Sequence, residues 1–296
     1  MTRVLILGGS GMLGHRLYLA ARERFATTAT VRSWAALGAA RSVFDRSHVI
    51  DGIDASHLDS VVRAFGAARP DVVVNCVGLV KQREEAKDPL AALAINAALP
   101  HQLAGLCSAT GSRLIHLSTD CVFSGSRGRY SEDDRADADD LYGRTKLLGE
   151  VSTAPALTLR TSMIGRELGR GTGLLEWFLA QQTHAAGFTR AIFSGLTTPV
   201  LAALLVDLIE HQPGLHGLYH VAAEPISKCE LLRLAARAFN VPTVVEPTEG
   251  AAVDRSLDGS KFARVARFVA PSWPVMLKEL AEDPLPYERI RNGNDA

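Results

Sequence analysis

Tyr142 and Lys146 are spaced so that their side chains share one face of a helix, because residues four apart lie side by side. A free phenol has a pKa of about 10 and exchanges protons poorly at neutral pH. Lowering the pKa of Tyr142 by about 3 requires roughly 4 kcal/mol, which one close ammonium in a dry cleft could largely supply. Thr119, at the end of an expected strand, adds a hydroxyl for the oxygen whose proton Tyr142 exchanges. We expect acid–base chemistry on a carbonyl or alcohol, although Tyr-x-x-x-Lys alone also arises by chance.

A glycine-rich turn lies between an apolar segment at 4–7 and an expected helix at about 12–24. Glycines in such a turn let the backbone approach a pyrophosphate, which binds at the amino end of the helix. The spacing Gly-x-x-Gly-x-x-Gly differs from the Gly-x-Gly-x-x-Gly of many dinucleotide dehydrogenases. An ordinary strand–helix turn is the alternative. The order of strand, loop and helix favours a dinucleotide site formed by Gly8, Ser10, Gly11, Met12, Leu13 and Gly14.

Residues after the next strands bear on which dinucleotide binds. Such sites usually carry an acidic residue for a free ribose at the end of the second strand, whereas this chain has Arg32. A guanidinium suits a 2′-phosphate, so we expect NADP(H), with NAD(H) as the alternative; Arg32 could equally be a solvated loop residue. Asp54 is a candidate for the adenine amino group or for a helix N-cap. Cys76, Val77 and Gly78 follow the fourth strand, where ligands bind in parallel sheets, unless they form a plain turn.

The first half of the chain alternates apolar strands with amphipathic helices, the pattern of a parallel sheet covered on both faces. We expect an α/β protein with a Rossmann-type doubly wound sheet over residues 1–165 and a smaller carboxyl-terminal substrate-binding lobe over most of 166–296. Residues from about 195 to 222 should return to the sheet. The expected strands are 4–7, 28–31, 48–50, 71–75, 113–117, 157–160 and 217–221. The expected helices are 12–24, 54–68, 90–109, 141 onward, 174–182, 200–210 and 227–239.

Some single residues should shape these elements. Pro100 should kink or split the helix at 90–109. Asn96 is a poor helix former there and should bind the backbone of a neighbouring element. His116 is expected to be a packed core histidine. We expect a flexible segment at 165–173 and an irregular tail from Ala270, which is rich in Pro, Asp and Asn.

The composition excludes several classes of protein. The 296 residues include 32 basic and 32 acidic ones, a balance that argues against binding nucleic acid or a membrane surface. No apolar run approaches the length of a membrane span, the best candidate at 200–209 being short, and no signal peptide is visible. The four cysteines lack metal-binding or disulfide spacing. We therefore expect no metal and a cytoplasmic location.

The glycine turn, Ser118-Thr119-Asp120, Tyr142-x-x-x-Lys146 and Gly149-Glu150 together resemble the extended short-chain dehydrogenase/reductases. More narrowly, segments 115–125, 142–150 and 159–162 are similar to the dTDP-4-dehydrorhamnose reductases. Gly195-x-Thr197-Thr198 and Arg255-Ser256-Leu257-Asp258 are less specific matches. The resemblance implies a Rossmann lobe for the cofactor and a smaller lobe that grips a nucleotide sugar.

The resemblance also implies roles for individual residues. Thr119, Tyr142 and Lys146 would be catalytic: Tyr142 protonates the ketone oxygen while the nicotinamide delivers hydride to its carbon. Lys146 would lower the pKa of Tyr142 and hold the nicotinamide ribose, so that both residues also contact the cofactor, and Thr119 would orient the ketone. The substrate contacts implied are Thr119, Asp120, Cys121, Arg160, Thr198 and Arg255; the two arginines could instead be surface salt-bridge partners.

Two departures leave the substrate open. Cys121 stands where these reductases usually have a tyrosine, and Met163 where they commonly have a tryptophan. Related dehydratases use an Asp-Glu pair, and Asp120-Cys121 lacks the glutamate, which argues against dehydration. We expect NADPH-dependent reduction of a nucleotide-linked 4-keto-6-deoxy sugar in polysaccharide or dTDP-rhamnose biosynthesis. An epimerase and a non-catalytic NADP-binding regulatory subunit are the alternatives. A homodimer could form through the helices at 90–109 and 141–151, which could equally pack on the sheet.

Overall fold

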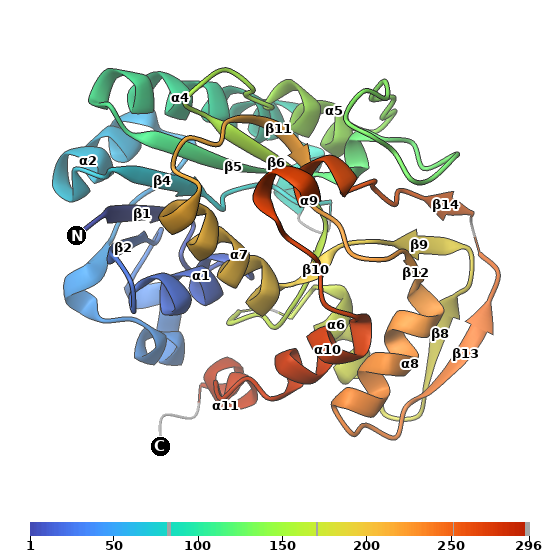
Figure 1. Ribbon diagram of the computed structural model, residues 1–296. Coiled ribbons are helices and arrows are strands. Elements are labelled where there is room, and N and C mark those ends of the chain that lie inside the picture. Colours follow the sequence, from blue (N-terminus) through green and yellow to red (C-terminus); the bar gives the residue numbers. More distant parts are fainter. Residues whose placement is uncertain (82–83, 170, 251, 294–296) are drawn as a thin grey trace.

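The computed structural model describes residues 1–81, 84–169, 171–250 and 252–293. Within these residues, one parallel sheet has seven strands in the order β11-β6-β5-β4-β1-β2-β3 (Figure 1). Its members are β1 (Arg3–Leu7), β2 (Ala26–Thr30), β3 (Val49–Ile50), β4 (Val72–Asn75), β5 (Arg113–Thr119), β6 (Leu157–Thr161) and β11 (Gly217–His220). The strand order reverses between β1 and β4, so this is a Rossmann-like sheet and the predicted doubly wound fold is confirmed.

Helices cover both faces of the sheet, as the near-continuous apolar strands require. On β1, Val4 and Ile6 belong to the core formed with α1 (Gly14–Ala21) and α7 (Thr198–His211). Leu5 and Leu7 belong to the opposite core, formed with α2 (Leu58–Ala68) and α4 (Leu99–Thr110). Both α1 and α2 begin a few residues later than predicted.

The long helix predicted at 90–109 is interrupted before its proline. It consists of α3 (Pro89–Ala92), a π-helical turn (Leu93–Ala98) and α4, and Pro100 lies in the first turn of α4, where its missing N–H costs least. The whole run, Pro89–Thr110, is 22 residues long and contains an 18-residue stretch with a mean hydropathy of 1.4, so the expectation of no run of membrane-spanning length was wrong by that measure. Leu99 and Leu103 are fully buried against the sheet, as in a core helix.

The carboxyl-terminal lobe is built from short strands and helices beside the carboxyl ends of the sheet (Figure 1). Ser227 caps the helix α8 (Lys228–Ala238), because its hydroxyl accepts a hydrogen bond from Glu230 N at 3.1 Å. The remaining elements are α5 (Leu141–Leu148), β7 (Met163–Ile164), α6 (Leu174–Leu179), β8 (His184–Phe188), β9 (Ala191–Phe193), β10 (Leu196–Thr197), β12 (Ile226–Ser227), α8 (Lys228–Ala238), β13 (Val244–Thr248), β14 (Val253–Asp254) and α9 (Ser260–Ala266).

The tail is helical, so the prediction that it is irregular was wrong. It forms α10 (Trp273–Ala281) and α11 (Tyr287–Asn292), and Figure 1 shows α11 lying near the end of the chain. Its prolines permit this, because Pro274 lies in the first turn of α10 and Pro286 immediately precedes α11. Residues 294–296 of this predicted tail, and residue 170 of the segment predicted at 165–173, lie outside the described residues.

Candidate active site

A cavity of about 610 Å³ lies where the carboxyl ends of β4, β5 and β6 meet the carboxyl-terminal lobe. The lobe contributes an apolar wall that includes Phe188, Ile192 and Phe193. Ligands of doubly wound proteins bind at this edge of the sheet. Most of the residues predicted from the sequence line the cavity: Gly11, Met12, Leu13, Cys76, Val77, Gly78, Thr119, Asp120, Cys121, Tyr142, Lys146 and Arg255.

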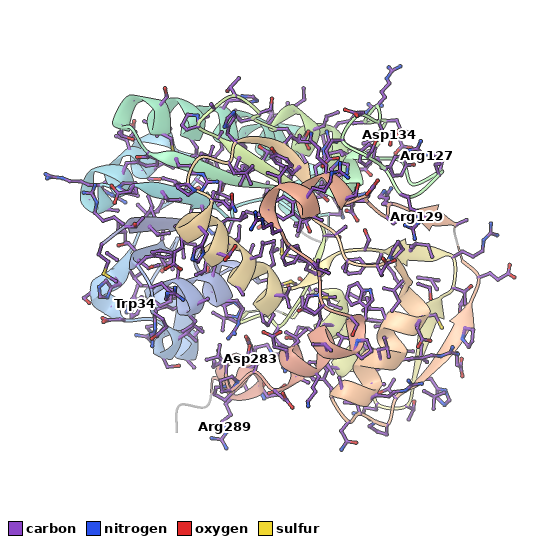
Figure 2. The ribbon with its side chains drawn as sticks, in the orientation of Figure 1. Trp34, Arg127, Arg129, Asp134, Asp283 and Arg289 are labelled. Carbon is purple, nitrogen blue, oxygen red and sulfur yellow. The ribbon has the colours of Figure 1, made fainter. Side chains whose placement is uncertain are left out.

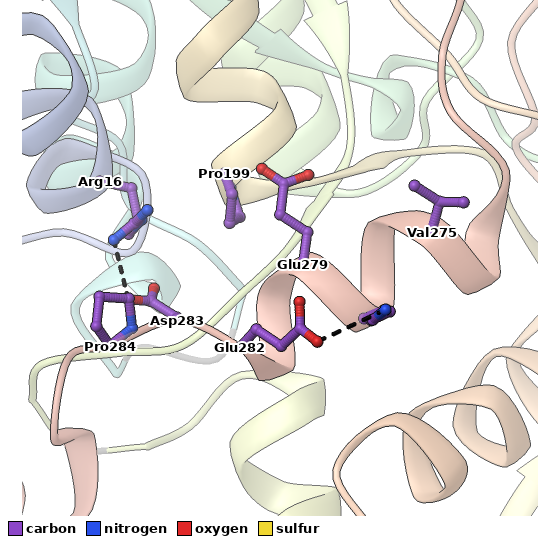
Figure 3. Close-up of a pocket in the computed structure, with 8 residues that line it drawn as sticks. Arg16, Pro199, Val275, Glu279, Glu282, Asp283 and Pro284 are labelled. Carbon is purple, nitrogen blue, oxygen red and sulfur yellow. Dashed lines mark hydrogen bonds and ion pairs between the residues drawn. The ribbon is translucent and has the colours of Figure 1, made fainter.

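A second hollow, of about 380 Å³, lies beside α10 and is lined by Arg16, Pro199, Val275, Lys278, Glu279, Glu282, Asp283 and Pro284 (Figure 3). None of these residues was predicted to take part in chemistry, and the hollow is wide open to solvent. We therefore place the candidate active site in the larger cavity.

Local contacts fix the helix that carries Tyr142 and Lys146. Asp140 caps α5 by accepting a hydrogen bond from Gly143 N at 2.8 Å. Gly143 must be glycine, because a Cβ there would lie 2.2 Å from the Cys121 carbonyl oxygen. The polar loop that leads into α5 is held by an ion pair between Arg127 and Asp134, which lie side by side in Figure 2.

Tyr142 and Lys146 both line the cavity, but the predicted fall in the pKa of Tyr142 was wrong in direction. Burial raises the pKa of Tyr142, with further increases from neighbouring Cys121 and Asp120. Lys146 is 4% exposed, and its ammonium donates a hydrogen bond to the Leu117 carbonyl oxygen at 2.7 Å. Burial lowers the pKa of Lys146 to about 8. Desolvation therefore favours the uncharged form of both groups, and Tyr142 is a protonated phenol at neutral pH.

Thr119 and Asp120 form a polar pair at the end of β5. The Thr119 hydroxyl donates to Asp120 Oδ1 at 3.1 Å and accepts from Cys121 N at 3.1 Å. Burial raises the pKa of the Asp120 carboxyl, although hydrogen bonds to it oppose the increase. Burial also raises the pKa of the Cys121 thiol to about 12, so Cys121 meets the cavity as a neutral thiol.

The glycine turn is shaped by close backbone packing. Gly8 has a φ of +82°, and a Cβ on Gly14 would lie 2.1 Å from the Gly8 carbonyl oxygen. No side chain caps the amino end of α1, and no acidic residue lies in its first turn. The turn residues Gly11, Met12 and Leu13 line the cavity at this uncapped end of α1, where the positive end of the helix dipole suits an anionic pyrophosphate. Gly8 and Gly14 thus shape the turn without lining the cavity, and Ser10 is exposed beside it.

Arg32 and Asp54 lie outside the cavity. Arg32 is exposed, and among the described residues it has no hydrogen-bonding or ion-pair partner. Asp54 accepts hydrogen bonds from the backbone and the hydroxyl of Ser56, at 2.9 and 2.7 Å. The helix begins only at Leu58, so Asp54 closes a turn before α2 and is not the helix cap that was its alternative role.

Arg160 and Thr198 do not reach the cavity, which contradicts their prediction as substrate contacts. Arg160 binds both carboxylate oxygens of Glu150 at 2.8 Å, and its guanidinium also contacts His220 at 3.2 Å. Thr198 is fully buried at the start of α7, against Gly165. The sequence did not reveal these partners of Arg160: Glu150 is 10 residues away, and His220 is 60 residues away on β11. Arg255 does line the cavity, and its Nε donates to the Phe123 carbonyl oxygen at 2.7 Å.

Sequence analysis missed three charged residues in the cavity wall. Lys81 pairs with Asp140 at 2.5 Å, and its ammonium lies 5.7 Å from the centre of the Tyr142 ring. Glu167 and Lys228 also line the cavity. The position of Lys81 shortly after the Asn75–Gly78 segment could have indicated it; Glu167 and Lys228 follow no motif. Among the described residues, no group of His, Cys, Asp and Glu is arranged to hold a metal ion.

The sheet order, the glycine turn after β1, and the cavity shared by Thr119, Tyr142 and Lys146 agree with the predicted resemblance to the extended short-chain dehydrogenase/reductases. The family model described as "RmlD substrate binding domain" matches residues 1–283, and the chain belongs to this family.

Two proteins similar to this chain have different functions. A dTDP-4-dehydrorhamnose reductase of Streptomyces griseus is 38% identical over 156 residues, a match that covers 52% of this chain and only 46% of that protein. The methionine adenosyltransferase 2 subunit beta of Xenopus tropicalis is 26% identical over 263 residues, covering 81% of this chain and 73% of that protein.

Solved structures share the fold. A dTDP-4-dehydrorhamnose reductase of Bacillus anthracis in complex with NADP has a TM-score of 0.78 at 22% identity, covering 96% of this chain and all of that one. A UDP-glucose 4-epimerase of Thermus thermophilus in complex with NAD has a TM-score of 0.75 at 17% identity, covering 95% and 98%.

Proposed function

We propose that this protein is an NADPH-dependent reductase of a nucleotide-linked 4-keto-6-deoxy sugar. The observation that carries the proposal is that Tyr142 lines one cavity with Thr119 and Lys146. Protonation of a ketone oxygen requires a group that still holds its proton at neutral pH, and Tyr142 does.

A bound nicotinamide dinucleotide would supply the hydride. The residues placed to hold it are the turn from Gly8 to Gly14 and the Cys76–Gly78 segment. Tyr142 would give its proton to the ketone oxygen, and the ammonium of Lys146 would stabilise the phenolate that this leaves. Because the pKa of Lys146 is about 8, that ammonium is mostly charged at neutral pH. The Thr119 hydroxyl would hold the ketone oxygen beside Tyr142.

The cavity residues and two related reductases support the class of substrate and cofactor. The cavity wall offers Lys81, Lys228 and Arg255, cations suited to a diphosphate, and aromatic Phe188 and Phe193. The reductases of Streptomyces griseus and Bacillus anthracis favour the sugar class, and the latter was solved with NADP. We place the reaction in cytoplasmic deoxysugar and polysaccharide biosynthesis.

The test is NADPH oxidation with a freshly prepared dTDP-4-keto-6-deoxy sugar, followed by loss of NADPH absorbance. Tyr142→Phe should abolish turnover and bind NADPH nearly as well as wild type. Tyr219→Phe is a matched control, because Tyr219 lies on β11 outside the cavity. Full turnover by Tyr142→Phe would overturn the mechanism. Sugar conversion without net NADPH oxidation would indicate an epimerase, as in the Thermus thermophilus structure.

A second candidate is a non-catalytic, NADP-binding regulatory subunit, which the similarity to methionine adenosyltransferase 2 subunit beta favours. Such a role has no need of the Tyr142–Lys146 pair. Co-purification with a stoichiometric partner, and no NADPH oxidation with any keto-sugar nucleotide, would select it.

We also propose that the chain self-associates: Leu90, Leu93 and Leu148 are 77%, 41% and 59% exposed on the helices predicted to pair. Light scattering of the purified protein would decide the oligomeric state.

A further inference from the structure

A buried chain of hydrogen bonds joins α11 to the glycine turn. His15 Nδ1 lies 2.8 Å from the Gly11 carbonyl oxygen, and its Nε2 lies 2.9 Å from the Tyr287 hydroxyl. Tyr287 in turn donates to Asp283 Oδ2 at 2.8 Å. His15 and Tyr287 are 0% and 1% exposed, so neither group has water as an alternative partner.

The other end of this chain is anchored on α1. Asp283 accepts from Arg16 at 3.0 Å (Figure 3), and Figure 2 shows Asp283 in the stretch between α10 and α11. Arg16 follows His15 directly on α1. The hydrogen bonds therefore run from the Gly11 backbone through His15, Tyr287 and Asp283 and return to α1 at Arg16.

The helix α11 also contacts residues on the opposite side of the cavity. Glu288 pairs with Arg166, and Arg291 pairs with Glu176. The Arg166 guanidinium lies 4.7 Å from the centre of the Tyr287 ring and binds Glu176 at 2.8 Å. Glu176 also accepts a hydrogen bond from the backbone of Glu167, a residue of the cavity wall, at 2.9 Å.

These two walls meet at the glycine turn. Gly11, Met12, Glu167 and Gly173 all line the cavity, and a Cβ on Gly173 would lie 2.8 Å from the Met12 methyl group. One α11 residue, Tyr287, thus contacts both the His15 ring behind Gly11 and the Arg166 side chain behind Glu167.

The ring of His15 can support Gly11 in one tautomer. A carbonyl oxygen only accepts, so Nδ1 must carry the proton that Gly11 receives. Burial lowers the pKa of His15 to about 4, which leaves Nε2 without a proton at neutral pH. The Tyr287 hydroxyl lies 2.9 Å from Nε2 and can give its one proton either to this nitrogen or to Asp283 Oδ2.

We propose that His15 and Tyr287 are positioning residues for the dinucleotide cofactor, and that α11 fixes the glycine turn against Arg166, Glu167 and Gly173 in the geometry that binds it. Neither residue lines the cavity; Tyr287 acts through His15, and His15 acts through Gly11. The inference rests on the cofactor part of the proposed function and is independent of the sugar.

The test is the Kd for NADPH, measured by titration calorimetry on the full chain. Tyr287→Phe keeps the ring and removes one hydroxyl, and we expect about 3- to 10-fold weaker binding. His15→Leu should weaken binding at least as much, and His15→Asn should recover part of the loss, because its amide N–H can still reach the Gly11 carbonyl. In the His15→Leu background, Tyr287→Phe should have no further effect. The control Tyr219→Phe should bind NADPH as wild type does.

Thermal unfolding and circular dichroism of each variant separate binding from folding. Should Tyr287→Phe fail to fold, Asp283→Asn offers the same test with the ring and hydroxyl intact. NADPH binding equal to wild type in the folded variants, or additive losses in the double variant, would overturn the inference alone. Wild-type protein that binds neither NADPH nor NADH would overturn the inference together with the cofactor part of the proposed function.

Discussion

Asn96 binds both polar groups of the Leu79 backbone. Its Oδ1 accepts from Leu79 N at 2.9 Å, and its Nδ2 donates to Leu79 O at 3.0 Å. Nδ2 also lies 3.3 Å from the Thr145 hydroxyl on α5, and Gly149 packs so closely on Asn96 that a Cβ would lie 1.9 Å from its carbonyl oxygen. One buried side chain therefore joins the segment after β4 to the helix that carries Tyr142.

Replacing Asn96 should destabilise the protein. Asn96→Leu leaves two buried or half-buried backbone groups of Leu79 without their partner, so we expect a loss of about 2–4 kcal/mol in the free energy of unfolding. Urea unfolding measures it. Ser108→Ala, at an exposed position of the same long helix, is the control and should change stability by about 0.5 kcal/mol or less. Equal stability of both variants would contradict the role of Asn96.

Lys146 should make stability depend on pH in the alkaline range. Its pKa falls from 10.5 to about 8 on folding, so the unfolded chain binds more protons between these values and stability rises with pH there. Below pH 8 the buried charge costs about 3 kcal/mol. Lys146→Met removes that cost and loses the bond to Leu117, worth about 1 kcal/mol.

We therefore expect Lys146→Met to be inactive yet about 1–3 kcal/mol more stable than wild type at pH 7, with the difference shrinking toward pH 10. Denaturant unfolding at both pH values provides the measurement. Lys278→Met, at a lysine whose side chain is 73% exposed, should show no such trend. A Lys146→Met difference that does not change with pH would argue against a depressed pKa.

Local patterns were enough to predict the sheet and the strand that ends at Thr119. The strand predicted at 71–75 is Val72–Asn75, and the one predicted at 113–117 continues to Thr119. A run of hydrophobic residues bounded by turn residues indicates a strand from only a few neighbouring positions in the sequence. The same holds for Asn96, because an amide in a helix interior is costly unless it binds backbone elsewhere.

Other features depend on partners far apart in the sequence. The direction of the Tyr142 pKa shift follows from burial beneath the lobe, which a four-residue spacing does not contain. The α11 helix is stabilised by contacts of Tyr287 with His15, 272 residues away, whereas the proline-rich composition of the tail alone favours irregular structure. The role of Arg160 was mistaken because its guanidinium pairs with Glu150, 10 residues away, and also contacts His220 on β11.

Arg160 should matter for stability and not specifically for substrate binding. Arg160→Leu leaves the buried Glu150 carboxylate without its partner, and we expect a loss of about 3–5 kcal/mol in the free energy of unfolding. The double variant Arg160→Leu/Glu150→Leu should recover much of it. Arg24→Leu, which breaks the surface pair with Glu210, is the control and should cost at most about 1 kcal/mol. A stable Arg160→Leu protein with only a raised substrate KM would restore Arg160 as a substrate contact.

Arg32 should decide between NADPH and NADH. Its exposed guanidinium has no partner among the described residues and lies just beyond β2, so it is available to a 2′-phosphate. Arg32→Ala should weaken NADPH binding about 10- to 100-fold, the worth of a charge-assisted hydrogen bond, and leave the Kd for NADH unchanged. Arg41→Ala is the matched control, because Arg41 is also exposed and its Nε bonds to the Gly38 carbonyl in its own turn. Calorimetric titration of the three proteins with both dinucleotides supplies the comparison. A wild-type protein that binds NADH several-fold more tightly than NADPH would refute the assignment of Arg32 to the 2′-phosphate.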